Sequence, residues 1–317
     1  MNEEEMDLLT EIAISYYEHE LTQEEIANKF NISRVKIGRL LKKARQEGIV
    51  DINVKYHPIF TSKLEQRLID EFGIQRALIA IDTQNELEQR KQVAALVNAY
   101  LASTLRDGMT VAVGQGRNVA AVGEYIGVLP ERNCKFICGI GGTHRIGSPI
   151  DADHICRNLA RKFNGTNETL YSPAYLEKPE FREIFLQNGV IKETLDKARK
   201  ADIALVGIGD MNENSYMVQL GWFTPQEITM ARMNLGVVGE IAGYGFFNFQ
   251  GEPADTVMNN RVIGLSLEDL RNIPCVIGIA SENTKATAIL GALRTGIINI
   301  IATTASNINT ILSLTKS

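Results

Sequence analysis

The sequence predicts an α/β protein in which an N-terminal winged helix-turn-helix precedes a doubly wound, mostly parallel sheet. Two short helical segments flank a sharp turn within residues 22–46. After residue 77, apolar runs of strand length alternate with segments of helical periodicity. We therefore expect one domain over residues 1–55 and a larger one over residues 56–317, as is usual for a chain of this length.

The composition is that of an ordinary globular protein. Of the 317 residues, 44% are apolar and 22% are charged, and the net charge is −5. The first residues, Met1–Glu5, are acidic and no apolar segment follows them, so we expect no secretory signal. The longest apolar runs, such as Ile203–Ile208, are far too short to span a membrane. We expect a cytoplasmic protein with no membrane partner.

Four cysteines are spread along the chain without the spacing of a disulfide framework: Cys134, Cys138, Cys156 and Cys275. A zinc site would need further ligands at matching spacing, and the sequence offers none. We expect buried, reduced thiols, no metal and no cofactor.

Charge is segregated sharply near the N-terminus. Residues 1–28 contain nine carboxylates and no Lys or Arg, whereas residues 29–45 contain seven basic residues and no carboxylate. A local basic stripe is what contact with phosphates needs, because only charges within about 8 Å act strongly at physiological salt. A solvated helix face is the alternative explanation for charge alone.

The residues around this stripe predict two capped helices. Thr22 is an N-cap candidate with Glu25 three positions later, which completes a capping box. Asn31 tolerates the left-handed backbone of a sharp turn. Ser33 then caps a second helix that extends to about Gln46. Two short helices and a tight turn describe a helix-turn-helix, which predicts binding to double-stranded DNA.

The second helix would enter the major groove with its first residues. Arg34, Val35, Lys36 and Arg39 are therefore the candidates for contact with base edges, and Lys42 and Lys43 for contact with phosphates. The whole set of predicted DNA-binding residues is Thr22, Gln23, Ser33, Arg34, Val35, Lys36, Arg39, Lys42 and Lys43. Gly38 is unexpected within a helix, since glycine there costs about 1 kcal/mol. Close approach to DNA or to a neighbouring helix would explain it.

A short strand and a linker are expected after this helix. Ile49–Val54 alternates apolar and polar residues, which predicts a strand and hence a winged motif. Lys55–Phe60 contains a proline and is predicted to be the linker. Ser62–Phe72 repeats leucine at helical spacing before a terminating glycine, so it is predicted to be an amphipathic helix.

The rest of the chain predicts a parallel sheet with helices on both faces, because its apolar runs lack polar alternation. The predicted strands are Ala77–Ile81, Thr110–Val113, Lys135–Ile140, Thr169–Tyr171, Ile203–Ile208, Val276–Ala280 and Ile297–Ala302. The predicted helices between them include Leu87–Leu105, Asp153–Phe163 and Thr284–Leu293.

Four segments at the predicted strand ends favour a phosphorylated or otherwise anionic ligand, because such sheets bind ligands beyond their carboxyl edge. They are Val113–Asn118, Gly139–Arg145, Gly207–Asp210 and Ser281–Lys285. Glycine-rich turns before helices can hold an anion through backbone N–H groups, with Arg117 and Lys285 adding charge. Glycines that merely reverse the chain are the alternative, and neither a dinucleotide-binding fingerprint nor a P-loop is present.

Over nearly its whole length the chain resembles the SorC/DeoR-type sugar-binding transcriptional regulators. The stretches that carry the resemblance are Leu21–Ala27, Arg39–Leu41, Gly48–Val50, Ala201–Gly209, Gly236–Ile241, Asn260–Leu267, Lys285 and Gly296–Asn299. The chain departs from the family pattern at Gln115-Gly116, where Trp-Gly is common, and at Glu240, where aspartate is common. It departs also at Ser281-Glu282, where two glycines are usual.

The resemblance implies an effector domain folded like sugar-phosphate isomerases, a homotetramer, and control of a carbohydrate-utilisation operon by a sugar or phosphorylated sugar. Together with the strand-end segments it gives these candidate effector-binding residues: Gly114, Gln115, Gly116, Arg117, Asn118, Gly141, Gly142, Thr143, His144, Arg145, Asp210, Glu240 and Lys285. Repression and activation both remain open.

Two other functions are weighed against a regulator. In an isomerase or lactonase-like enzyme with an appended DNA-binding unit, Lys285, Glu240, Asp210 and His144 would supply acid–base chemistry. No catalytic spacing is evident, so we favour ligand binding without catalysis. The third alternative is a DNA-binding scaffold without a ligand.

Overall fold

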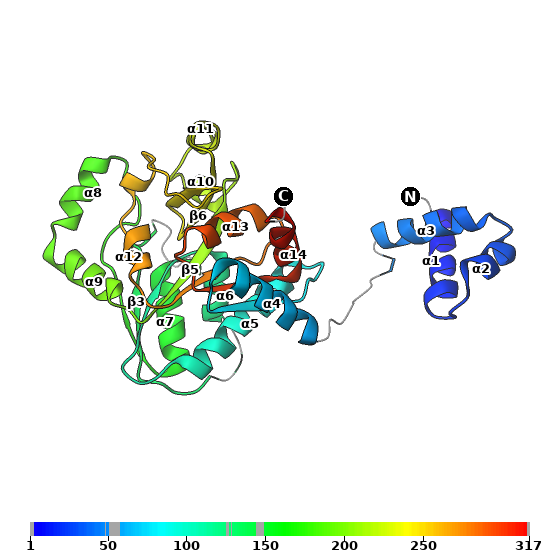
Figure 1. Cartoon of the computed structure of the whole chain (residues 1–317), viewed down its shortest axis with the longest axis horizontal. Helices are drawn as coiled ribbons and strands as arrows, with labels where there is room; N and C mark the ends of the chain where they lie inside the picture. Colours follow the sequence, from blue (N-terminus) through cyan, green and yellow to red (C-terminus); the bar gives the residue numbers. More distant parts are fainter. Residues whose placement is uncertain are drawn as a thin grey trace. The chain divides into compact units, whose positions relative to one another are not determined.

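The computed structural model describes residues 3–47, 49–50, 58–124, 127, 129–143 and 149–315. The chain divides into two compact units, Met1–Lys55 and Tyr56–Ser317 (Figure 1). Among the described residues, no helix has both the length and the apolar character needed to cross a membrane. No cluster of His, Cys, Asp or Glu in the same part of the chain is arranged to hold a metal.

The N-terminal unit consists of three helices in its described part: α1 Glu3–Tyr17, α2 Gln23–Phe30 and α3 Arg34–Gln46. Its core is formed by the fully buried side chains Ile12, Ile26, Ile37 and Leu41. Thus α1, α2 and α3 each contribute to one apolar cluster. Helices α2 and α3 were predicted, whereas α1 was not, although Leu9, Ile12 and Ala13 stand at helical spacing and are buried.

The predicted caps are confirmed. Thr22 and Glu25 form a reciprocal capping box at the start of α2, and the Ser33 hydroxyl accepts a hydrogen bond from the Lys36 backbone N–H. Asn31 has a φ of 53° and ends α2 in the left-handed conformation. These local hydrogen bonds fix where both helices begin, and so which residues lie in the first turn of α3.

The structure does not test the predicted wing and corrects the predicted linker. Ile49 and Val50 are not in a strand, and Asp51–Val54 lie outside the described residues, so the wing stays a prediction. The predicted linker is too long, because α4 begins at Pro58 rather than at Ser62. Proline suits the first turn of a helix, since its fixed φ is helical and its missing N–H would be unpaired there anyway.

The second unit contains a parallel sheet of strands in the order β1-β9-β8-β5-β2-β3-β4 among its described residues. Its elements are α4 Pro58–Phe72, β1 Arg76–Ala80, α5 Glu86–Thr104, β2 Thr110–Val113, α6 Arg117–Glu124, β3 Lys135–Cys138, α7 Ala152–Phe163, β4 Thr166–Glu168, α8 Pro179–Leu186, α9 Gly189–Arg199, β5 Ile203–Asp210, α10 Tyr216–Gln219, α11 Pro225–Leu235, β6 Val237–Ile241, β7 Gly245–Asn248, the 3-10 turn Asn259–Arg261, α12 Leu267–Arg271, β8 Val276–Ile279, α13 Ala286–Arg294, β9 Ile300–Thr304 and α14 Ala305–Leu314. The predicted α/β class is confirmed.

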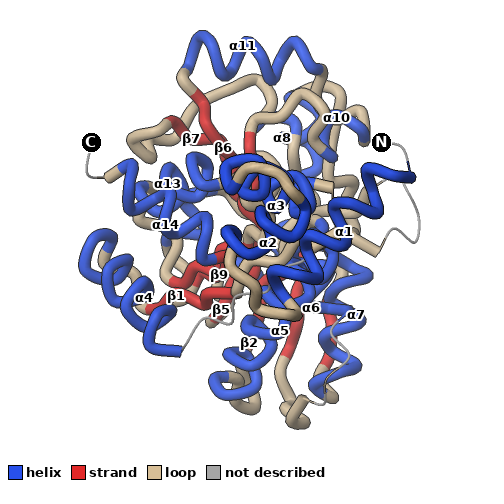
Figure 2. The backbone as a smooth tube through the Cα atoms, turned by 90° about the vertical axis from the view of Figure 1, so that its right-hand side faces the viewer, coloured by secondary structure: helices blue, strands red, loops and turns tan. Residues whose placement is uncertain are grey.

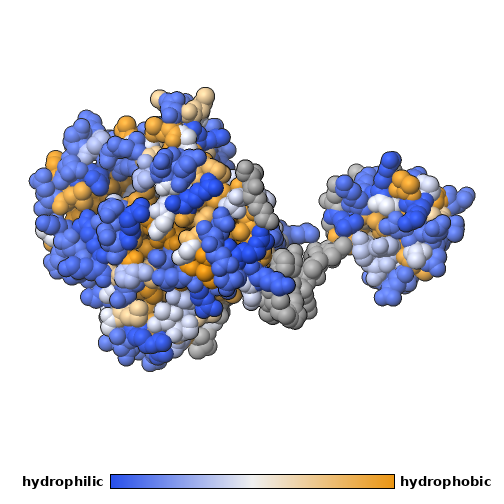
Figure 3. All heavy atoms as spheres, viewed as in Figure 1, coloured by the Kyte–Doolittle hydropathy of each residue, from blue (hydrophilic) through white to orange (hydrophobic). Residues whose placement is uncertain are grey.

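Helices cover both faces of this sheet. Helix α6 packs between α5 and α7, and α14 packs against α4 and α13; Figure 2 shows these two groups on either side of the strands. Consecutive residues of β8 and β9 are all buried, as a sheet covered on both faces requires. Over the view in Figure 3, hydrophilic residues cover most of the surface of the described parts.

Several predicted boundaries are wrong. Thr169–Tyr171 is not a strand, because the edge strand β4 pairs with β3 through Thr166–Glu168 instead. The hairpin of β6 and β7 was not predicted; β6 runs antiparallel to β5, which extends to Asp210. Gly207–Asp210 is therefore part of a strand rather than a loop. The antiparallel partner, far along the chain, gives these residues backbone hydrogen bonds that local patterns do not reveal.

The four cysteines are free, as expected. Cys134, Cys138 and Cys156 are buried and Cys275 is partly buried. Burial, together with the neighbouring Cys138 thiol, raises the pKa of the Cys156 thiol well above its usual value. Burial also raises the pKa values of the Cys134 and Cys275 thiols, which favours their neutral form.

Candidate functional site

The sheet reverses its winding between β2 and β5. From β2 the order proceeds outward through β3 and β4, and from β5 it proceeds the other way through β8 and β9. Connections leave such neighbouring strands on opposite faces, which opens a crevice beyond their carboxyl ends. The segments that follow β2 and end β5 are Gly114–Asn118 and Gly207–Asp210, so the topology places them at one site.

A pocket of about 110 Å³ lies at this point. Its lining residues are Gln115, Gly116, Arg117, Asn118, Gly207, Ile208, Gly209, Asp210, Ser215, Tyr216, Met217, Glu240, Gly243, Glu282 and Lys285. The pocket thus brings together seven of the sequence-predicted residues: Gln115, Gly116, Arg117, Asn118, Asp210, Glu240 and Lys285.

Four other predicted residues, Gly114, Gly141, Gly142 and Thr143, are not among those that line the pocket. A Cβ at Gly114 would stand 3.1 Å from the Leu205 carbonyl, and one at Gly141 would stand 2.6 Å from backbone atoms of Pro173. Both glycines therefore permit close packing of backbones. Gly142 and Thr143 are also outside the pocket lining. His144 and Arg145 lie outside the described residues.

Thr143 has a structural partner. Its backbone N–H and its hydroxyl both donate to Asp151 Oδ2, at 2.7 and 3.0 Å. Asp151 in turn caps α7 through its other oxygen, which accepts from the Asp153 N–H. The Thr143 side chain therefore anchors its segment to the start of α7.

The side chain of Glu240, the first carboxylate of the pocket, occupies space that is free only because the residue opposite it is a glycine. Glu240 on β6 pairs in register with Gly209 on β5, and a Cβ at position 209 would stand only 1.9 Å from Glu240 Oε1. The other oxygen accepts a hydrogen bond from the Gly243 backbone N–H. Burial raises the pKa of Glu240 to about 7, against the hydrogen bond from Gly243 and the charge of Lys285. This carboxyl can therefore donate or accept hydrogen bonds near neutral pH.

The second carboxylate, Glu282, is held by cations and an amide. Its side chain lies 3.0 Å from Lys285 Nζ and accepts a hydrogen bond of 3.0 Å from Asn118 Nδ2. Arg90 and Arg117 approach its other oxygen at 3.4 and 3.9 Å. Burial alone would raise the pKa of Glu282, but Lys285 and the hydrogen bonds hold it at about 2. The group is a permanent anion at neutral pH.

Sequence reasoning missed some of these residues. Glu282 was noted as a departure from a family pattern but not as a site residue. Arg90 lies in the first turns of α5, a segment whose sequence indicates only a helix and not a ligand site. Tyr216, Met217 and Gly243 belong to short segments between β5 and β7. A carboxylate three residues before Lys285, at the start of a helix, is the signal that could have found Glu282.

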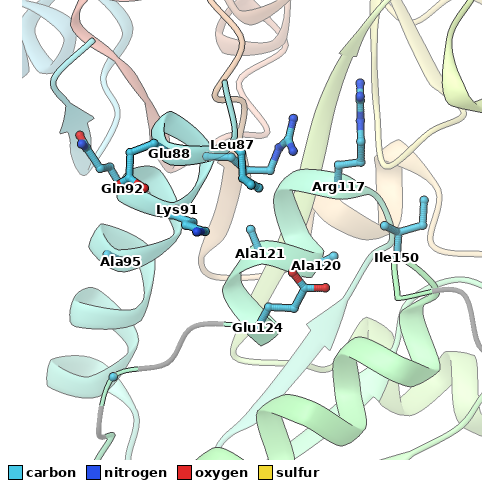
Figure 4. A pocket seen from close by; sticks show the side chains of 12 residues that line it. Leu87, Glu88, Lys91, Gln92, Ala95, Arg117, Ala120, Ala121, Glu124 and Ile150 are labelled. Atoms are coloured by element: carbon cyan, nitrogen blue, oxygen red, sulfur yellow. The ribbon is translucent and has the colours of Figure 1, made fainter. Parts of the chain in front are cut away.

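A second hollow of about 540 Å³ lies between α5 and α6 (Figure 4). Its walls include the short side chains of Ala95, Ala120 and Ala121, with Leu87 and Ile150 at its sides. It is larger than the pocket at the strand ends and is bordered by Glu88, Arg90, Lys91, Gln92, Arg117 and Glu124, but most of its exposed wall is apolar. Ligand recognition needs convergent polar groups, and the smaller pocket offers them.

In the N-terminal unit, the predicted DNA contacts lie mostly on one helix. Arg34, Val35, Lys36, Arg39 and Lys42 are exposed, and Val35 has 68% of its surface exposed. An exposed valine in the first turn of a helix has no packing role in its own unit. It is available to a partner surface.

Besides Ser33, which caps α3, three of the predicted residues have internal side-chain partners. Thr22 donates its hydroxyl to Glu25, as part of the capping box. Lys43 forms an ion pair with Glu5 of α1, and that hydrogen bond raises the pKa of Lys43. Arg34 lies 3.9 Å from Glu24, with both side chains well exposed, which is a weak contact.

Comparisons with known proteins agree with this architecture. Residues 56–313 match the family model Sugar-bind, described as "Putative sugar-binding domain". The sorbitol operon regulator of Klebsiella pneumoniae is 29% identical over 311 residues, which cover 95% of this chain and 96% of that protein. The chain belongs to the SorC/DeoR-type family of sugar-binding transcriptional regulators.

Other members of the SorC/DeoR-type family support the same assignment. The structure of full-length SorC from Klebsiella pneumoniae is similar with a TM-score of 0.73 and 28% identity, covering 98% of this chain and 100% of that chain. A structure titled "Putative Sugar-Binding Domain of Transcriptional Repressor" from Vibrio fischeri has a TM-score of 0.77 and 55% identity, covering 81% and 100%. The regulator LsrR of an Enterobacter species is 28% identical over 319 residues, covering 98% and 94%.

Proposed function

We propose that this member of the SorC/DeoR-type family is a DNA-binding regulator of a carbohydrate-utilisation operon, controlled by a sugar-type effector in the pocket between β2 and β5. The observation that carries the proposal is that two candidate binding sites, one for DNA and one for a small ligand, occur in the same chain. An exposed basic helix with defined caps stands in one unit, and a pocket of convergent polar groups stands at the switch point of the other.

The proposed DNA contact uses the first turns of α3. Ser33 caps this helix, so Arg34 and Val35 stand at its very start, where recognition helices contact bases. Arg39 is one turn further along and is also exposed. Arginine can donate two hydrogen bonds to guanine, and valine can contact the thymine methyl group. Lys42 is proposed to contact phosphate. Residues 1–55 then form the DNA-binding domain.

The proposed effector contacts are the polar groups of the pocket. Gln115 and Lys285 present N–H donors, while Asp210 and Glu240 present acceptors. Such an arrangement suits the many hydroxyls of a carbohydrate. Residues 56–317 are proposed to bind the effector and to assemble the chain into a homotetramer, without catalysing a reaction. Because the Vibrio fischeri relative is titled a repressor, we propose repression that the effector relieves.

Operator binding by the full chain tests this function. A DNA fragment from upstream of the chain's own operon, labelled for fluorescence anisotropy, should bind in the nanomolar range at physiological salt. Arg34→Ala and Arg39→Ala should each weaken binding by about 1–3 kcal/mol and leave the thermal unfolding of the protein unchanged. Unchanged affinity in both variants would refute this placement of the recognition helix.

A further inference from the structure

Resting on the proposed function, we propose that the effector of this chain is an uncharged sugar or polyol rather than a sugar phosphate. The anion position of the pocket is already filled by the carboxylate of Glu282, which belongs to the protein itself. Glu282 thereby acts as the residue that selects against a phosphorylated ligand.

Glu282 occupies the position that a bound anion would take. Lys285 and Asn118 contact one of its oxygens at 3.0 Å each, and Arg90 contacts the other at 3.4 Å. These are the donors that a phosphate would need, and only 8% of the Glu282 surface is exposed. A phosphate could reach Lys285 and Asn118 only by displacing this carboxylate.

The surrounding hydrogen bonds hold Glu282 in place. The Ser281 hydroxyl donates to Asn118 Oδ1 at 2.6 Å, which orients the Asn118 amide so that its N–H groups face Glu282. Gln89 donates to the Ser281 carbonyl, and Asn307 donates to the Glu282 carbonyl at 3.0 Å. Side chains from α5, α6 and α14 therefore fix both the backbone and the carboxylate. Movement of Glu282 would break this buried network.

The charges of the pocket are already balanced without a ligand. Among the described residues that line it, the carboxylates are Asp210, Glu240 and Glu282 and the cations are Arg117 and Lys285; Arg90, which is not part of the lining, lies 3.4 Å from Glu282 Oε1. Because the pKa of Glu240 is about 7, the three carboxyl groups carry at most three negative charges near neutral pH, which the three cations compensate. A phosphate would add about two negative charges beside three carboxylates. An uncharged ligand adds none and leaves the existing pairs intact.

The remaining hydrogen-bonding groups suit hydroxyls. Lys285 Nζ uses one N–H for Glu282 and one for the Ile208 carbonyl at 3.1 Å, which leaves one donor for a ligand. Asp210 accepts hydrogen bonds as a carboxylate, and Glu240 donates when protonated and accepts when ionised. Alternating donors and acceptors match successive hydroxyl groups, each of which both donates and accepts.

The test compares inorganic phosphate binding by the full wild-type chain and by Glu282→Gln, which keeps the shape of the side chain but removes its charge. Thermal unfolding is measured against phosphate concentration, at an ionic strength held constant with chloride. We expect no phosphate-specific stabilisation of the wild type and apparent binding at least about tenfold tighter in Glu282→Gln. Glu193→Gln, an exposed change on α9 with the same loss of charge, should behave as the wild type. Equal phosphate binding by wild type and Glu282→Gln would overturn the proposal.

A second arm needs no variant, so it decides the matter even if Glu282→Gln does not fold. The wild type is screened by calorimetry with matched pairs of free sugars or polyols and their monophosphates. At least one free compound should bind at least about tenfold tighter than its phosphate; preference for the phosphate form would overturn the proposal. Operator binding is measured separately on the same sample. A chain that binds no operator contradicts the proposed function, whereas a chain that binds an operator and prefers sugar phosphates contradicts only the present inference.

Discussion

The carboxylate of Glu240 lies where any side chain at position 209 would have to stand. A Cβ on Gly209 would be 1.9 Å from Glu240 Oε1, far inside van der Waals contact. The glycine in β5 and the acid in β6 are opposite each other in an antiparallel register. Gly209 therefore makes room for a pocket carboxylate, so a position that looks like a turn glycine in the sequence shapes the proposed ligand site.

Gly209→Ala should consequently damage the pocket more than the fold. The added methyl group must push Glu240 away, at a cost of about 1–3 kcal/mol. We expect thermal stabilisation by the effector to be lost while the α/β circular dichroism spectrum is kept. Gly189→Ala is the control, because a Cβ there meets no atom within 4 Å. Effector binding that survives in Gly209→Ala would show that Glu240 is not held in this way.

The raised pKa of Glu240 predicts a specific pH dependence. A carboxyl whose pKa is about 7 when folded and about 4.5 when unfolded binds more protons in the folded state between those values. The stability that it contributes is therefore complete below pH 4.5 and is lost as the pH rises through 7, with a slope of at most about 1.4 kcal/mol per pH unit. Glu240→Gln should remove this decline. The check is the difference in unfolding free energy between wild type and variant from pH 5 to 8, and equal slopes would contradict the assignment.

Gly38 lies in α3, the proposed recognition helix, and its replacement should change protein stability and DNA affinity in different directions. The nearest atom to a Cβ at this position is Gln23 Oε1 at 3.5 Å, an ordinary contact, so packing of α2 on α3 does not require the glycine. Gly38→Ala should stabilise the N-terminal unit by up to about 1 kcal/mol through helix propensity. If the bare backbone serves close approach to DNA, operator affinity should fall in the same variant. A stabilised protein with unchanged affinity would remove Gly38 from the interface.

The neighbours Lys42 and Lys43 should differ in their effect on DNA binding. Lys42 is exposed, whereas Lys43 is paired with Glu5 of α1. Lys42→Ala should lower the slope of log affinity against log salt by about 1, as the loss of one phosphate contact does. Lys43→Ala should change that slope less, because its charge is already compensated within the unit. An equal loss of slope in both variants would contradict the role given to the Glu5 pair.

Features that depend on contacts between residues close in the sequence could be predicted, whereas features that depend on contacts between distant residues could not. The caps at Thr22, Ser33 and Asn31 were predicted because their hydrogen bonds join residues three to five positions apart. All the parallel strands of the described sheet except β4 were predicted, because burial on both faces makes them continuously apolar, whereas β4 is a short polar strand at the edge. The β6–β7 hairpin was missed, since its first strand is held by β5, about 30 residues earlier in the chain.

The pocket could likewise be predicted from the sequence only in part. Its strand-end glycines and Lys285 could be selected from local patterns. The anchoring of Glu282 could not, because its partners Arg90 and Asn118 come from helices almost 200 and 164 positions away. A sequence gives the residue types of such a cluster but not their juxtaposition, which depends on the packing of α5 and α6 against the sheet.

We propose that a ligand in the pocket between β2 and β5 sets the affinity of α3 for DNA. The most direct measurement is a titration of labelled operator with the full chain, in the absence and presence of a saturating free sugar or polyol that stabilises the protein. The predicted result is a change in operator affinity of about 5- to 150-fold, absent in Gly209→Ala and retained in Gly189→Ala. Operator affinity that stays constant with every compound that binds the pocket would contradict the account.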